Sequence, residues 1–141
     1  MPLSRRAATT ALITGFSTLS TLLAAPLAAH AKGARQCLTV LYPWQQDARF
    51  DFDYYRNKHL GMMRKLYGKS VGGMQVRKGL HKGDGSPPAF VASVTIEITS
   101  MEGFDAAGKQ HLPTLMADLP NFSNVTPLGQ IEEIMGSDPI S

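Results

Sequence analysis

The segment Phe90–Ile98 carries the pattern that most constrains the fold. Its residues alternate between two sides, with Phe90, Ala92, Val94, Ile96 and Ile98 on one and Val91, Ser93, Thr95 and Glu97 on the other. Successive side chains of a β-strand point to opposite faces of a sheet, so this alternation predicts a strand with one buried face. Such strands are typical of an antiparallel sheet that is covered on one side.

Three further segments are predicted to be strands. Cys37–Tyr42 is short, apolar and followed by Pro43, which stops it. Met74–Leu80 alternates, and a turn-forming loop over residues 82–88 separates it from the strand at Phe90. Leu128–Ile134 is predicted to be the last strand.

Two helices are predicted between these strands. Asp51 caps a helix that runs to about Tyr67, where Gly68 ends it. One face of this helix carries Phe52, Tyr55, His59, Met62 and Leu66. The second helix spans about Met101–Leu119, with a face that carries Phe104, Ala107, His111, Leu112, Leu115 and Met116. Pro113 should kink or restart it.

The resulting order is βαββαβ, which predicts a ferredoxin-like α+β domain whose two helices cover one face of a four-stranded antiparallel sheet. The other face then needs a cover. Cys37–Tyr42 has apolar residues on both sides, which indicates that a partner sheet packs there, although Ser93, Thr95 and Glu97 are polar on that side of their strand.

Residues 1–31 are predicted to be a removable signal peptide and residues 32–141 the domain. Arg5 and Arg6 begin the leader, a weakly apolar stretch follows, and Ala29-His30-Ala31 forms a cleavage site before Lys32. The arginine pair also suggests the twin-arginine route, with general secretion as the alternative. A stable membrane anchor is disfavoured, so the mature chain is expected in the periplasm or outside the cell.

Charge and cysteine content exclude several function classes. The leader holds two arginines and no acidic residue, so its removal lowers the net charge from +3 to +1, and no basic block remains to bind nucleic acid. Cys37, the only cysteine, is expected to be a buried strand residue. The sequence shows no spacing typical of metal ligands and no phosphate-binding glycine motif. It therefore predicts that the protein uses no metal and no cofactor.

Three segments together resemble the EthD family, named from ethyl tert-butyl ether degradation. They are residues 50–59 (FDFDYYRNKH), 78–80 (KGL) and 117–122 (ADLPNF). The resemblance covers roughly residues 37–134. It implies a ferredoxin-like fold whose sheets pair into a dimeric α/β barrel, and hence a homodimer. Relatives of the barrel type include cofactor-free monooxygenases, cyclases, decarboxylases and isomerases, so the resemblance leaves the reaction open.

His59 is the candidate catalytic residue. It shares a helix face with Tyr55 and Met62, and a neutral imidazole there could accept a proton from a phenol or a carbon acid. Tyr55, His111, Met62 and Phe122 are the candidate substrate-binding residues. The alternative is a core histidine, and Asp51, Asp53 and Asp118 are assigned structural roles at helix ends.

The sequence thus predicts an exported homodimer that binds a small apolar or aromatic molecule. Such a protein could catalyse isomerisation, cyclisation, decarboxylation or oxygenation by proton transfer without a cofactor. A binding or accessory protein without catalysis is the alternative.

Overall fold

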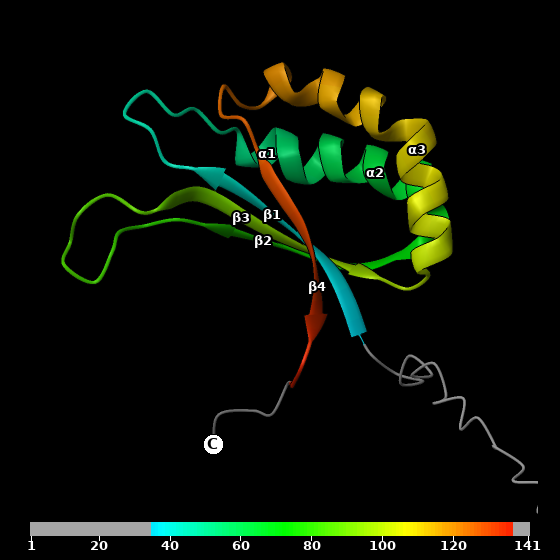
Figure 1. The fold of residues 1–141 in the computed structure, drawn as a ribbon. Coiled ribbons are helices and arrows are strands. Elements are labelled where there is room, and N and C mark those ends of the chain that lie inside the picture. The colour runs from blue at the N-terminus through cyan, green and yellow to red at the C-terminus, as the bar shows by residue number, and fades with distance from the viewer. Residues whose placement is uncertain (1–34, 137–141) are drawn as a thin grey trace, which may run out of the picture.

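The computed structural model describes residues 35–136, and the predicted leader lies outside that range. One antiparallel sheet has the order β2-β3-β1-β4, and the helices lie on one of its faces (Figure 1). The strands are β1 (Arg35–Pro43), β2 (Val71–Lys78), β3 (Phe90–Ile98) and β4 (Leu128–Ile134). The helical segments are α1 (Phe52–Tyr54), η1 (Tyr55–His59), α2 (Leu60–Tyr67), η2 (Gly68–Ser70), α3 (Met101–Asp118) and η3 (Leu119–Asn121). The predicted βαββαβ order and ferredoxin-like α+β class are confirmed.

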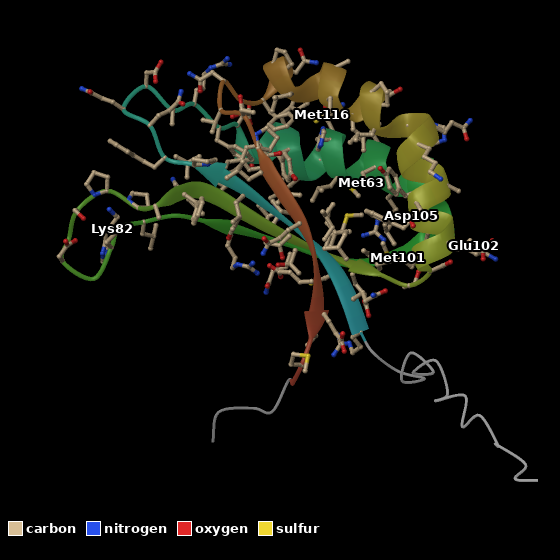
Figure 2. All side chains as sticks on the ribbon, in the orientation of Figure 1. Met63, Lys82, Met101, Glu102, Asp105 and Met116 are labelled. Carbon is tan, nitrogen blue, oxygen red and sulfur yellow. The ribbon has the colours of Figure 1, made fainter. Side chains whose placement is uncertain are left out.

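The core lies between the sheet and the helices. The predicted buried face of β3 is confirmed, since Ala92, Val94 and Ile96 are almost completely buried. They pair with Tyr42, Val40 and Leu38 of β1, which therefore point to the same face. Figure 2 shows Met63 on the side of α2 that faces this core.

β2 differs from its prediction at both ends. It begins at Val71, three residues before the predicted Met74, and ends at Lys78, so that the predicted strand residue Leu80 is exposed in the loop. Gly72 and Gly73 lack the side chains that would reveal an alternating pattern, and the register between β2 and β3 shifts there.

The first helix contains a turn that the sequence did not predict. Asp51 caps its start as predicted, since its carboxylate accepts a hydrogen bond of 2.9 Å from the Tyr54 N–H. Tyr55–His59 then forms a π turn, in which the Leu60 N–H bonds to the Tyr55 carbonyl rather than to that of Arg56. Gly68 ends the helix as predicted, with a φ of 54°.

α3 runs through Pro113 without interruption, and Figure 1 shows it bending near its middle. Proline has no N–H, so the carbonyl of Lys109, four residues earlier, loses its helical donor. The predicted kink thus accounts for the bend. Within residues 35–136, no helix combines the length and apolarity needed to cross a bilayer.

The sheet face opposite the helices is polar. Thr39 donates a 2.5 Å hydrogen bond to Glu132, and Arg77 donates to Ser93 and Thr95. Cys37 is buried beside Glu132, as the sequence predicted for this residue. Hydrogen-bonded side chains on this face are compatible with water. This face therefore does not need a partner sheet to shield apolar side chains from water.

Candidate functional site

A cavity of about 90 Å³ lies between the sheet and the helices. Its helical wall on one side is Tyr55, His59, Met63 and Tyr67, each four residues after the one before. Strand residues Leu38, Val40, Tyr42 and Ile96 form the floor, and α3 with the following loop contributes Leu112, Leu115, Met116, Leu119, Phe122 and Pro127. Leu112 is 51% exposed and Met116 44% exposed, so they mark the entrance.

His59 lies on the helical wall of this cavity, and a carboxylate holds its imidazole. Its Nδ1 lies 2.9 Å from Oδ2 of Asp118, the last residue of α3. An ionised carboxylate can only accept hydrogen bonds, so Nδ1 must carry the hydrogen. When the ring is neutral, its lone pair is therefore on Nε2, for which residues 35–136 offer no hydrogen-bond partner.

Asp118 is held in turn by two further donors. The Tyr54 hydroxyl and the Asn121 side-chain amide both donate to Oδ1, at 2.8 and 2.9 Å. Burial of the carboxyl disfavours its ionisation, but the hydrogen bonds from Asn121, His59 and Tyr54 outweigh this, so the pKa of Asp118 lies below its usual value. Asp118 is thus a fixed anion that orients the imidazole and would stabilise its protonated form.

The π turn aligns His59 with the cavity. In a regular α-helix, residues four apart are displaced by about 40° around the axis, so four residues at that spacing would drift off one face. The extra residue in the Tyr55–His59 turn offsets this drift. It brings Tyr55, His59, Met63 and Tyr67 onto the cavity wall.

Two aromatic rings pack against the imidazole and against each other. The Tyr55 ring stacks on it at 5.0 Å between centroids, and the Phe122 ring lies 4.6 Å away. The Asp51 N–H bonds to the Phe122 carbonyl, and a bridge pairs Phe50 with Ser123, which together fix this loop against the helix start. Together with the rest of the core, these rings leave His59 only 8% exposed.

Two tyrosines in the cavity wall keep their protons at neutral pH. Burial raises the pKa of Tyr42 to about 12 and also raises the pKa of Tyr55. Neither phenol can act as a base under physiological conditions, but each can donate a hydrogen bond. His59 is therefore the one residue of the cavity wall suited to accept a proton.

The structure brings together only some of the predicted site residues. His59, Tyr55 and Phe122 line the same cavity, whereas Met62 and His111 do not. Met63 takes the place predicted for Met62, because the π turn shifts the helix phase by one residue. On α3, Leu112 and Leu115 line the cavity instead of His111, which is half-buried.

Asp118 is the hydrogen-bond partner of His59, a pairing that the sequence did not predict. A structural role at the helix end was favoured for it, yet it bonds directly to His59 across 59 residues of chain. No local spacing rule connects residues so far apart. The one available signal was that both residues belong to segments that resemble the EthD family.

The described residues 35–136 contain no cluster of three or more histidine, cysteine or acidic side chains that could hold a metal ion. Asp118 is the only acidic residue within 4 Å of His59 in that range.

No protein-family model and no curated protein matches the chain. Solved structures do. An EthD-like protein from Ralstonia eutropha JMP134 is 33% identical, with a TM-score of 0.69, and the match covers 74% of this chain and 96% of that protein. An EthD family protein from Bacillus halodurans C-125 is 18% identical over 67% of this chain and 96% of its own, with a TM-score of 0.45.

A dimeric ferredoxin-like protein from Thermobifida fusca YX is 14% identical, with a TM-score of 0.44, over 73% of this chain and 93% of its own. The sheet order and the helix layer define a small α+β protein of ferredoxin-like fold. The identity to the Ralstonia protein over nearly its whole length specifies the family. This chain belongs to the EthD-like family.

Asp118 is expected to stabilise the folded chain in a pH-dependent way. Its folded-state pKa is lowered, so its contribution is present above the unfolded value, near 4, and is lost as the pH falls through the folded value. We expect Asp118→Asn to cost about 1.5–3 kcal/mol at pH 7. The difference from wild type should shrink below pH 4 in urea unfolding curves.

Asp105→Asn is the matched control, because Asp105 is an exposed carboxylate on the same helix (Figure 2). It should change stability by less than about 0.5 kcal/mol. An Asp118→Asn penalty that persists unchanged at pH 2.5 would contradict an ionic contribution.

Proposed function

We propose that this protein binds a small apolar or aromatic molecule in the His59 cavity and transfers a proton on it. The observation that carries the proposal is the Asp118–His59 pair, in which a fixed carboxylate aims a basic nitrogen into an otherwise apolar pocket. Catalytic histidines are oriented by carboxylates in this way in unrelated enzymes.

The reaction needs no group beyond the chain and its substrate. Nε2 of His59 accepts a proton from a phenol or from a carbon next to a carbonyl, and Asp118 stabilises the imidazolium. Returning that proton to a different atom of the same molecule completes an isomerisation or a cyclisation. The Tyr42 and Tyr55 hydroxyls are candidate donors to the oxygen that becomes negative.

The size and shape of the cavity restrict the ligand. About 90 Å³ is less than the roughly 150 Å³ that holds a benzene molecule in an engineered protein cavity. We infer that the reacting end of the ligand enters the cavity while the rest lies against Leu112 and Met116 at the entrance. These exposed apolar side chains favour an apolar or aromatic body.

The proposal is tested by what the natively purified protein carries. Mass spectrometry under native conditions should find a bound organic molecule, and that molecule should exchange an acidic C–H for deuterium faster with protein than without it. Binding without faster exchange would favour the alternative, a non-enzymatic binding protein that uses the same apolar cavity.

We also propose that the chain acts as a homodimer. The family resemblance implies a dimeric barrel. β4 supports a protein contact because no other strand of residues 35–136 pairs with its outer edge, while Leu128, Ile131 and Met135 are exposed in or beside it. Light scattering should give twice the mass of one chain at micromolar concentration. Ile131→Lys should favour the monomer, and a monomeric wild type would refute the proposal.

We further propose export, with cleavage after Ala31, on the evidence of the leader pattern in residues 1–31. Amino-terminal sequencing of the natively produced protein should begin at Lys32. Replacing Arg5 and Arg6 by lysine should block export if the twin-arginine route is used, while unchanged export would assign general secretion. An intact Met1 on a cytoplasmic product would refute the proposal.

A further inference from the structure

A second concavity lies on the other side of the first helix, away from the His59 cavity. It has a volume of about 700 Å³ and runs between the helix and β2. The two share no lining residue. The volume of this second concavity is within the range of roughly 300–1,000 Å³ that small-molecule sites occupy.

The walls of this groove carry positive charge from both sides. Arg56 and Arg64 come from the helix and Lys78 from β2, and no acidic residue lines the groove. Among residues 35–136 the only ion pairs are Arg35–Glu97 and His59–Asp118, so these three cations have no carboxylate within 4 Å there. Three other cations of this helical region, Lys58, Lys65 and Lys69, lie outside the groove.

The floor of the groove is largely apolar, with Gln75 as a polar residue among its strand residues. Leu60, Met74 and Val76 contribute to it, and Phe52 lies at one end with the Lys78 ammonium 5.7 Å above its ring. A smaller concavity of about 330 Å³ shares Phe52 and Lys78 and continues past Trp44. Apolar surface is therefore available beyond the cationic walls.

Gly61 keeps the groove open. A Cβ built at this position in α2 would meet no atom within 4 Å, so nothing packs against the helix there. Glycine lowers the stability of a helix interior, so helix propensity does not explain why position 61 is a glycine.

We infer that this groove binds a small organic anion, with a carboxylate or phosphate held by Arg56, Arg64 and Lys78 and an apolar body on the floor. Arginine guanidinium groups present paired donors that match the oxygens of both anions. This anion site does not depend on whether His59 transfers a proton.

Amide NMR titrations of the full mature chain provide the test, with naphthalene-2-carboxylate and 2-naphthyl phosphate as anionic probes and 2-naphthamide as their neutral counterpart. The anions should shift amides of residues 56–64 and 74–78, and the stronger of the two identifies the preferred head group. The neutral amide should bind at least about tenfold more weakly, equivalent to losing one charge-assisted contact.

Two double variants separate a built site from general attraction. Arg56→Gln with Arg64→Gln should weaken binding of the preferred anion at least about tenfold, whereas Lys58→Gln with Lys65→Gln removes the same charge from the same helix and should change it less than about twofold. Gly61→Leu should block the site while the chain stays folded, because the new side chain enters open space.

Equal weakening by both double variants would overturn the inference, as would equal binding of 2-naphthamide. Shifts that map to the His59 cavity instead of the groove would also overturn it. The same holds if the groove amides change with protein concentration alone, since that outcome assigns the groove to a second copy of the chain.

Discussion

Replacing His59 with glutamine is expected to leave the chain folded and to slow proton exchange on the bound ligand by about 10²–10⁴-fold. The amide keeps most of the volume and can still hydrogen-bond to Asp118, but it cannot accept a proton at neutral pH. The measurement is the rate of deuterium exchange on the molecule that copurifies, together with the thermal unfolding of each variant.

His111→Gln is the matched control, because this histidine lies on the other helix and does not line the cavity. It should leave the exchange rate unchanged. Asp118→Asn should lower the rate less than His59→Gln and shift its pH profile, which a purely structural change would not do. Full exchange in the glutamine variant would rule out His59 as the base.

His59→Ala separates a pocket residue from a core residue. If the imidazole only fills space, alanine should destabilise the fold by roughly 1–3 kcal/mol through a cavity and a lost hydrogen bond, with ligand binding intact. If it lines a binding pocket, the larger change should be in binding and exchange.

Phe122→Ala is expected to produce the largest loss of stability, about 3–5 kcal/mol. Its ring is 1% exposed and contacts the rings of Tyr42, Phe50, Tyr55 and His59. Because small domains are stable by only about 5–15 kcal/mol, this variant should unfold at a clearly lower urea concentration. Urea titration followed by circular dichroism gives the value.

Leu80→Ala serves as its control, since Leu80 is 75% exposed in the β2–β3 loop. It should change stability by less than about 0.5 kcal/mol. A Phe122→Ala penalty below 1 kcal/mol would mean that the loop after α3 is not part of the folded core, and the aromatic packing against His59 would then have to be abandoned.

The elements of this fold follow from local patterns. Alternation located β3, and Asp51 and Gly68 marked where the first helix begins and ends, because caps and strand faces depend on neighbours in the chain. β2 was misplaced at its start, since Gly72 and Gly73 carry no side chains from which a face can be identified.

The site was predictable only in part. Tyr55 and His59 are four residues apart, so a helical face connects them, and the family resemblance added weight to His59. Met62 was predicted where Met63 lies, because a π turn changes the helix phase without a residue type that signals it. Asp118 depends on how α3 packs, which is a property of the tertiary structure.

The π turn also means that the position of His59 could change while the rest of the fold stays the same. It holds one residue more than an ordinary helical turn, and the positions between Tyr55 and His59 are exposed. Deleting one of them, such as Asn57, would let the turn relax to an α-helix without removing a buried side chain. The imidazole would then follow Tyr55 by three α-helical residues, about 60° short of a full turn, and would no longer lie in line with Tyr55 on the cavity wall. A single in-frame codon loss or gain could therefore turn the proposed proton-transfer site off or on during evolution.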